Sequence, residues 1–247
     1  MKRFQRTLHH LYAFALSVTI LSAIAGFSDN KNERSISHTA TDRDTVDQRL
    51  KITLPEAGKL VNGKPTGKNW NNLIASLDEW NADKTFWSLT KGILHGDYNG
   101  GEFHNYAWTK KQYKDFELQA VIKMEGKEAN SGVCIRINPV NADEVPGYQV
   151  DMGPGYWGCL WEEKRSGMVS KFPEVLADQI VNKNGWNHYY IIAKGHHIEA
   201  WLNGVKTIDV VHDAGFDLGA IGFQLCHGDK HTTVDVKTLY IKEISGS

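Results

Sequence analysis

The chain has 247 residues, of which 41% are hydrophobic, enough for one folded domain with a sizeable core. Its formal net charge of -1 excludes the strongly basic surface that binds nucleic acid or an acidic membrane. The 8 tryptophans and 9 tyrosines are many for this length. Aromatic side chains stack on sugar rings, but any single one more often fills a β-sheet core.

The first 25 residues have the composition of a secretory signal peptide. A basic N-terminus precedes an uncharged apolar stretch, residues 11–25, which ends in the small-x-small pattern Ala23-Ile24-Ala25. The stretch is short for a membrane span of about 20 residues. We therefore expect an exported protein, periplasmic or secreted, with no membrane association beyond the signal peptide. An uncleaved N-terminal anchor is the alternative.

The rest of the chain divides into a linker and one domain. Residues 26–50 are polar and charged with few apolar positions, which is typical of a flexible linker. Residues 51–247 have the apolar content of a single domain, without a second linker or an internal repeat.

Alternation of apolar and polar residues predicts that this domain is built from strands. Strands are expected at 116–124, 133–138, 147–153, 186–194, 198–203, 205–211, 219–226 and 234–244. Short helices are expected at 71–78 and 173–180. Asn203-Gly204 predicts a tight hairpin because both residues tolerate positive φ, and 194–197 predicts a second one. The fold class is therefore all-β: an antiparallel β-sandwich, of which the jelly roll is one form, with one or two short helices.

One of these strands carries an unusual polar face. Tyr148, Val150 and Met152 share one face of the strand, and Gln149 and Asp151 share the other. A sheet face that gathers carboxylates, amides and aromatic rings is typical of a sugar-binding site.

The same alternation extends this face to three more strands. Arg136, Trp201 and Gln224 each lie opposite aliphatic neighbours, so we expect all three beside Gln149 and Asp151 in one groove. The alternative is that each polar residue faces solvent, as is usual in antiparallel sheets.

Glu162-Glu163 followed by Arg165 is the strongest acid/base cluster. Neighbours on a strand point to opposite faces, so only one carboxylate enters the groove, and parity favours Glu163. An arginine beside a carboxylate keeps it ionised, as a general base requires, and we assign that role to Arg165. A surface ion pair is the alternative.

Two histidines and one further tryptophan complete the candidate site. His104 lies in a Gly-rich loop, and His227 ends a strand where a bend would aim it at the mouth of the groove. Trp157 follows the polar strand and offers a ring for stacking on a sugar. Solvated loop histidines and a core tryptophan are the alternatives.

The sequence defines no metal site. Asp97, Asn99 and Asp151 offer oxygen ligands for a divalent cation such as calcium, but they lack the spacing of an EF-hand. HExxH, P-loop, GxGxxG and GxSxG patterns are missing, so zincin, nucleotide-binding and serine-hydrolase chemistry have no support.

An ordered series of short motifs resembles the 3-keto-disaccharide hydrolase family, long described as a domain of unknown function with a concanavalin A-like jelly roll. The motifs include Trp87-Ser88-Leu89, Asn130-Ser131-Gly132-Val133, Gly147-Tyr148-Gln149-Val150-Asp151, Tyr156-Trp157-Gly158, Trp201-Leu202-Asn203-Gly204 and Gly222-Phe223-Gln224, over about residues 59–244. Each motif is weak alone, but their order is specific.

The resemblance implies an enzyme that cleaves 3-keto-glycosides or 3-keto-disaccharides made by a sugar C3 oxidoreductase. Glu163 would then remove the C2 proton, and Arg136 and Arg165 would stabilise the oxyanion, with or without a metal. His104 or His227 would assist the leaving group. Gln149, Asp151 and Gln224 would bind hydroxyls or a divalent ion.

The chain departs from its relatives in the polar strand. The family often has Tyr-Glu-x-Gln where this chain has Tyr148-Gln149-Val150-Asp151, which indicates a distinct subfamily. Two other functions stay open. A non-catalytic carbohydrate-binding module would bind sugar without turnover, and a structural envelope protein would neither bind nor cleave sugar.

Overall fold

The computed structural model describes residues 50–228 and 231–245. The expected signal peptide and residues 26–49 of the expected linker lie outside the described residues. The strands are β1 (Leu60–Val61), β2 (Lys64–Pro65), β3 (Asn71–Asn72), β4 (Trp80–Asn81), β5 (Trp87–Thr90), β6 (Ile93–Tyr98), β7 (Asn105–Tyr113), β8 (Phe116–Glu125), β9 (Ser131–Ile137), β10 (Gly147–Met152), β11 (Leu160–Glu163), β12 (Gly167–Ser170), β13 (Asn187–Lys194), β14 (His197–Leu202), β15 (Val205–Val211), β16 (Gly219–Leu225) and β17 (Thr232–Glu243). The helices are the 3-10 turns η1 (Glu56–Gly58) and η2 (Leu77–Glu79) and the α-helix α2 (Glu174–Ile180).

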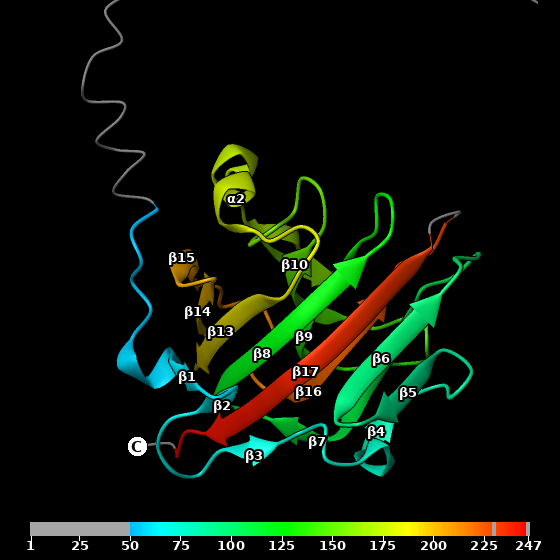
Figure 1. Ribbon diagram of the computed structural model, residues 1–247, viewed down its shortest axis with the longest axis horizontal. Helices are drawn as coiled ribbons and strands as arrows, with labels where there is room; N and C mark the ends of the chain where they lie inside the picture. Colours follow the sequence, from blue (N-terminus) through cyan, green and yellow to red (C-terminus); the bar gives the residue numbers. More distant parts are fainter. Residues whose placement is uncertain (1–49, 229–230, 246–247) are drawn as a thin grey trace, which may run out of the picture. The chain divides into compact units, whose positions relative to one another are not determined.

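Two antiparallel sheets form a sandwich. The seven-stranded sheet has the order β12-β11-β10-β9-β16-β7-β4, and the eight-stranded sheet has the order β15-β14-β13-β8-β17-β6-β5, with β3 paired to β17. Figure 1 shows the eight-stranded sheet in front of the seven-stranded one. The predicted all-β antiparallel sandwich is confirmed.

Period-2 alternation fills the space between the sheets. On β10 the side chains of Tyr148, Val150 and Met152 belong to the central core, so Gln149 and Asp151 face away from it. The apolar positions of β8, β13, β14 and β17 meet them from the opposite sheet. The outer face of the seven-stranded sheet therefore receives the polar half of β10.

Two predicted turns are confirmed. Asn203 and Gly204 both have positive φ, 49° and 91°, and they join β14 to β15. Positive φ at both central residues matches the right-handed twist of a hairpin, and Asn and Gly adopt it with the least strain. The turn around Gly195 joins β13 to β14, as expected from the sequence.

The N-terminal half of the domain was predicted less well. The expected helix at 71–78 is wrong: residues 71–72 pair with β17, and Ser76 caps the short η2 turn. Strands β1 to β7 have little alternation and were not predicted from it. The expected helix at 173–180 is confirmed as α2, which packs Leu176 and Ala177 into the core.

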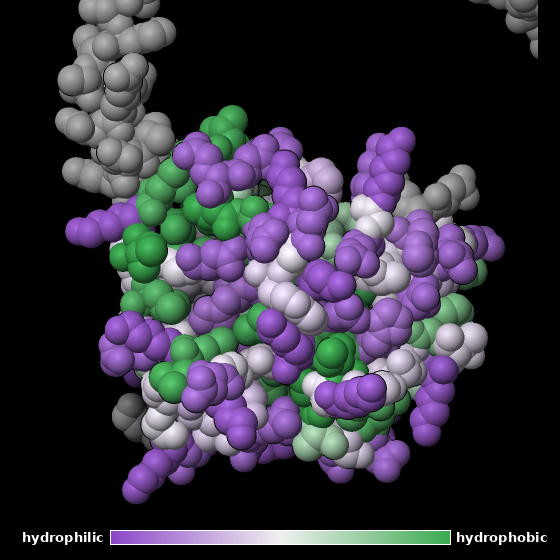
Figure 2. Space-filling view, viewed as in Figure 1, coloured by the Kyte–Doolittle hydropathy of each residue, from purple (hydrophilic) through white to green (hydrophobic). Residues whose placement is uncertain are grey.

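The outer face of the eight-stranded sheet carries mainly hydrophilic residues, as Figure 2 shows. Among the described residues no helix is both long enough and apolar enough to cross a membrane.

Candidate functional site

A cavity of about 520 Å³ opens on the outer face of the seven-stranded sheet. Its base is formed by side chains of β10, β11 and β16, and its walls are formed by the β8–β9 and β10–β11 loops. The lining residues are His104, Glu128, Ala129, Asn130, Gln149, Asp151, Pro154, Tyr156, Trp161, Glu163, Gln224 and Cys226. Five predicted site residues are therefore brought together here: His104, Gln149, Asp151, Glu163 and Gln224.

Gln149 is the centre of a buried polar network in this cavity. Its Nε2 donates to Asp151 Oδ1 at 2.7 Å and to Gln224 Oε1 at 3.1 Å, and its Oε1 accepts from Cys134 Sγ at 3.3 Å. Gly132 makes room for it, because a Cβ at that position would lie 2.3 Å from Gln149 Cγ. The glutamine is thus fixed by partners on three strands.

Gln224 extends the hydrogen-bond network to His104. Its Nε2 donates to the Tyr106 hydroxyl at 2.6 Å and to His104 Nδ1 at 3.2 Å. The backbone N–H of His227 also donates to His104 Nδ1, at 3.1 Å. Because Nδ1 accepts both bonds, the proton of the neutral imidazole lies on Nε2.

The His104 ring is uncharged at neutral pH. Burial lowers its pKa from 6.5 to about 4, and the nearby His227 acts in the same direction. The two rings lie 4.2 Å apart, centroid to centroid. His104 is therefore a neutral hydrogen-bond donor through Nε2, and it is not a proton-transfer acid at neutral pH.

Asp151 is a protonated acid at neutral pH. Burial raises its pKa from 3.8 to about 8; the Gln149 hydrogen bond opposes this rise, and the Glu163 carboxylate adds to it. Its side chain is almost fully buried at the base of the cavity. A carboxyl group this deeply buried keeps its proton because the charged form is poorly solvated.

Glu163 occupies the last position of β11 and is only half-buried. Burial raises its pKa, while the positive charge of Lys164 and that of His227 when protonated act in the opposite direction. Glu163 is the less buried carboxyl group of its pair with Asp151, so burial opposes its ionised form less strongly.

Two aromatic rings that the sequence did not single out form one side of the cavity. Tyr156 and Trp161 meet edge to face with centroids 6.4 Å apart. Trp161 pairs with Gln149 across β10 and β11, which places both side chains on one face. The sequence shows that Trp161 shares a strand face with Glu163, but it does not show that Trp161 lies opposite Gln149 on the neighbouring strand.

A family model for 3-keto-alpha-glucoside-1,2-lyase-like domains matches residues 56–242. The chain belongs to this family. The resemblance seen in the sequence is therefore confirmed, and it makes this a carbohydrate-active β-sandwich protein with a sugar substrate. A search of the curated proteins finds no match.

Solved structures share the fold of this 3-keto-glucoside lyase-like domain. A candidate glycosyl hydrolase from Parabacteroides distasonis has a TM-score of 0.53 at 23% identity and covers 72% of this chain and 100% of its own. The carbohydrate-binding module CBM66 from Bacillus subtilis has a TM-score of 0.52 at 14% identity and covers 71% of this chain and 96% of its own. A Bacillus subtilis protein with a galectin-like fold has a TM-score of 0.51 at 10% identity and covers 70% of this chain and 94% of its own. At these identities the likeness establishes the fold alone.

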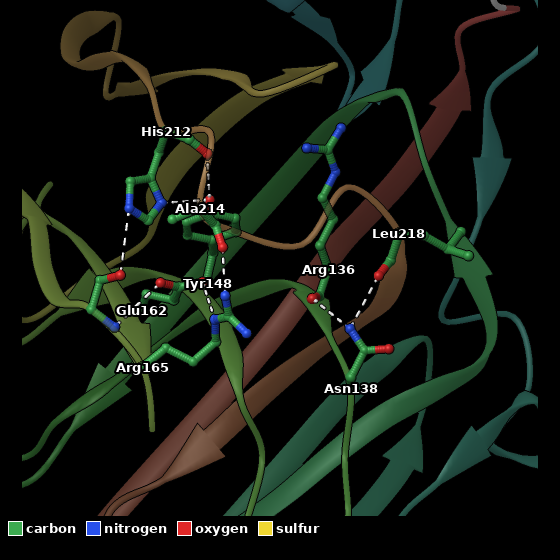
Figure 3. Close-up of polar contacts among 9 residues, drawn as sticks. Arg136, Asn138, Tyr148, Glu162, Arg165, His212, Ala214 and Leu218 are labelled. Carbon is green, nitrogen blue, oxygen red and sulfur yellow. Dashed lines mark hydrogen bonds and ion pairs between the residues drawn. The ribbon is translucent and has the colours of Figure 1, made fainter.

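Arg165 does not contact Glu163, so the predicted pairing is wrong. Its Nε donates to Glu162 Oε1 at 2.8 Å, and its Nη2 donates to the Ala214 carbonyl (Figure 3). Lys164 has a φ of 56°, in the left-handed region. The extended backbone is interrupted there, so Arg165 no longer shares a face with Glu163. Arg165 therefore fixes the β11–β12 turn from the side opposite the cavity.

Arg136 is also absent from the cavity of this lyase-like domain, contrary to prediction. It is fully buried; its Nε and Nη2 donate to the Lys114 carbonyl at 2.8 and 2.6 Å, and its Nη1 donates to the Gly195 carbonyl at 2.6 Å. Arg136 has a φ of 50°, which shifts the alternation so that Ile137 continues the outer face of β9. Figure 3 shows its guanidinium pointing away from Tyr148 and Arg165. Its role is to tie two turns together.

The two predicted tryptophans lie elsewhere. Trp201 is on β14 of the other sheet, where its Nε1 donates to Thr53 Oγ1 at 3.2 Å, so its expected place in the groove is wrong. Trp157 does not line this cavity, and most of its ring is in the central core. His227 is exposed beside His104 and contacts its ring, but it does not line the cavity.

The expected oxygen ligands for a cation are not brought together. Asp97 pairs with His231 at 2.8 Å on the edge of the other sheet and does not line the cavity with Asp151. In the described part of the chain, His197, Glu199 and Asp209 form the one group of three candidate ligands within 4.8 Å. The Lys206 ammonium already contacts both carboxylates, at 2.5 and 2.8 Å, so this group is a surface ion-pair cluster.

Proposed function

We propose that this protein is an exported enzyme that cleaves the glycosidic bond of 3-keto-glycosides by elimination. The observation that carries the proposal is the cavity in which an ionisable Glu163, a protonated Asp151 and the neutral donor His104 converge. The family match supports a keto-sugar as the substrate class.

The ketone makes elimination feasible. A C3 carbonyl acidifies the C2 proton, so a carboxylate can remove it and leave an enolate. The enolate re-forms the C3 carbonyl, a C1–C2 double bond appears, and the C1 oxygen leaves with its bonding electrons. That oxygen then needs a proton. Addition of water at C1 and return of a proton to C2 complete a net hydrolysis.

Glu163 is the proposed base. It is the carboxylate of the pair, it reaches the cavity from the end of β11, and its raised pKa makes it a stronger base than a solvated glutamate. The β11–β12 turn holds it in place through the Arg165–Glu162 ion pair on the opposite side.

Asp151 is the proposed acid for the leaving oxygen. It carries a proton up to a pH of about 8 and lines the same cavity as Glu163. Its hydrogen bond from Gln149 fixes the carboxyl plane. The two carboxyl groups then have opposite protonation states at neutral pH, as acid–base chemistry requires.

His104 is the proposed donor to the enolate oxygen. Its Nε2 carries the proton, and the Gln224 side chain and the His227 backbone hold the ring from Nδ1. A neutral donor in a partly buried site stabilises developing negative charge without giving up its proton. Tyr156 and Trp161 provide the rings on which a sugar face would stack.

The substrate implies a preceding reaction. A carbonyl at sugar C3 arises by oxidation of the C3 hydroxyl, so we propose a sugar C3 oxidoreductase as the functional partner. The N-terminal sequence supports export to the periplasm or the medium as the site of both reactions.

Incubation of the purified protein with 3-keto-trehalose tests the proposal, with trehalose as the matched control. We expect cleavage of the keto-sugar alone, because trehalose has no acidified C2 proton. A parallel reaction with a chelator measures any contribution from a divalent cation. Binding of either sugar without turnover contradicts the enzyme and favours a carbohydrate-binding module.

A further inference from the structure

A second cavity of about 450 Å³ adjoins the first. Ala129 and Pro154 line both cavities, so these two residues form the boundary between the cavities, here called the saddle. Glu128 and Asn130 line only the first cavity, whereas Gly126 and Lys127 line only the second. The β8–β9 loop is therefore a wall common to both spaces.

The shared wall is held firmly. Gly126 has a φ of 131°, and a Cβ there would lie 2.1 Å from the His231 carbonyl oxygen, so the loop packs tightly on its neighbour. Gly153 approaches the other side of the loop: a Cβ there would lie 2.7 Å from Asn130 Nδ2. The saddle thus has a fixed position relative to both cavities.

The lining of the second cavity combines an apolar base with a charged rim. Met124, Trp157 and Ala129 are nearly buried apolar residues that reach this space. Asp178 and Lys183 form a 2.8 Å ion pair at the rim. The other charged lining residues are Glu125, Lys127 and Glu174.

This composition fits one hexose ring. The carboxylates and ammonium groups of the rim are nearly balanced, which favours a neutral ligand with many hydroxyls over an ion. The parts of Trp157, Met124 and Ala129 that line the cavity offer an apolar surface for the C–H face of the ring. The volume lies within the roughly 300–1,000 Å³ of typical small-molecule sites.

We propose that the second cavity binds the departing sugar of a 3-keto-disaccharide, while the first cavity holds the oxidised ring. This inference rests on the proposed function, and it assigns the place where the leaving sugar binds. It also gives α2 and the following turn, which supply Asp178 and Lys183, a role in specificity. Trp157 would then contact substrate, although not in the cavity that carries the chemistry.

Kinetics with two substrates test the proposal. We compare 3-keto-trehalose, whose leaving group is glucose, with methyl 3-keto-glucoside, whose leaving group cannot fill the second cavity. Lys183→Ala and Asp178→Ala should each lower kcat/KM for the disaccharide about tenfold, the value of one hydrogen bond to a charged group, and leave the methyl glycoside unchanged. The control Lys110→Ala, at a separate cavity, should change neither. An equal effect on both substrates, or on neither, overturns the inference.

A binding measurement separates this inference from the proposed function. The indole N–H resonances of Trp157 and Trp161 report on the second and the first cavity, respectively. Added glucose should shift the Trp157 resonance in the wild type and shift it less in Lys183→Ala. Absence of cleavage of either keto-sugar contradicts the proposed function, whereas absence of a Trp157 shift contradicts the second site alone. A Trp157 shift from p-nitrophenol but not from glucose would assign the cavity to aromatic leaving groups and overturn the inference.

Discussion

The outer faces of the two sheets use the same alternation for different purposes. On the seven-stranded sheet, Gln149, Asp151 and Gln224 are buried inside a cavity, and Gln149 donates hydrogen bonds to the other two. On the eight-stranded sheet, Glu199 and Lys206 form an ion pair at the surface. Polar alternation alone therefore indicates an outer face, and the cavity above that face indicates a site.

The difference has an electrostatic consequence. Burial raises the pKa of Asp151 to about 8 because the hydrogen bond from Gln149 only partly replaces the lost hydration. On the other sheet, hydrogen bonds from Lys206 and His197 lower the pKa of Asp209, and the group stays largely in solvent. Only the first arrangement provides a proton donor at neutral pH.

The largest expected effect comes from the proposed base. Glu163→Gln removes the carboxylate and should lower kcat on 3-keto-trehalose by about 10²–10⁴, the usual contribution of general acid–base catalysis. The matched variant Glu199→Gln, on the other sheet, should keep the wild-type rate. Equal rates for wild type and Glu163→Gln would remove Glu163 from the mechanism.

The buried Asp151 should make the stability of the protein depend on pH. Between pH 4 and pH 8 the unfolded chain has an ionised Asp151 while the folded chain keeps the proton, so the free energy of unfolding falls as pH rises. The rise in pKa from 3.8 to about 8 sets an upper limit of about 6 kcal/mol on this fall. Asp151→Asn should remove this fall, measured by urea unfolding at several pH values. A parallel pH dependence in both proteins would contradict the protonated state.

A smaller effect is expected from the space that Gly132 leaves for Gln149. Gly132→Ala places a methyl group against the Gln149 side chain and should cost about 1–3 kcal/mol of stability. Gln149→Ala in the Gly132→Ala protein should recover part of that loss, because the clash disappears. Additive losses in this double-mutant cycle, measured by urea unfolding, would show that the two side chains do not interact.

The smallest effect should come from the surface cluster of the eight-stranded sheet. Lys206→Ala breaks partly exposed ion pairs with Glu199 and Asp209 and should cost about 0–1 kcal/mol, less at high salt. Thermal unfolding at two salt concentrations measures this. A loss above about 2 kcal/mol would show that this face is not an ordinary solvated surface.

Sequence alternation predicted the sheet well where strands are long and one-sided. β8 to β10 and β13 to β17 follow it, and Gln149, Asp151 and Gln224 were found through it. It failed where the backbone leaves the extended region. Positive φ at Arg136 and Lys164 changes which side chains face the cavity, and no sequence pattern marked those two residues.

Which sheet a strand joins was the second limit. Trp201 has the parity of an outward residue, but outward on β14 means the opposite surface of the sandwich from Gln149. Sheet membership depends on long-range pairing, which alternation within one strand does not contain. For the same reason Trp161 became visible only through the register of β10 with β11, and Tyr156 only through its ring contact with Trp161.

The most direct test of the central claim is the kinetic isotope effect of a substrate deuterated at C2. Elimination through Glu163 breaks the C2–H bond, so we predict that C2-deuterated 3-keto-trehalose reacts more slowly than the protiated sugar in kcat/KM under conditions that limit exchange with solvent. Cleavage at the same rate for both sugars, with the C2 deuterium retained in the product, would contradict elimination and the proposed roles of Glu163 and Asp151.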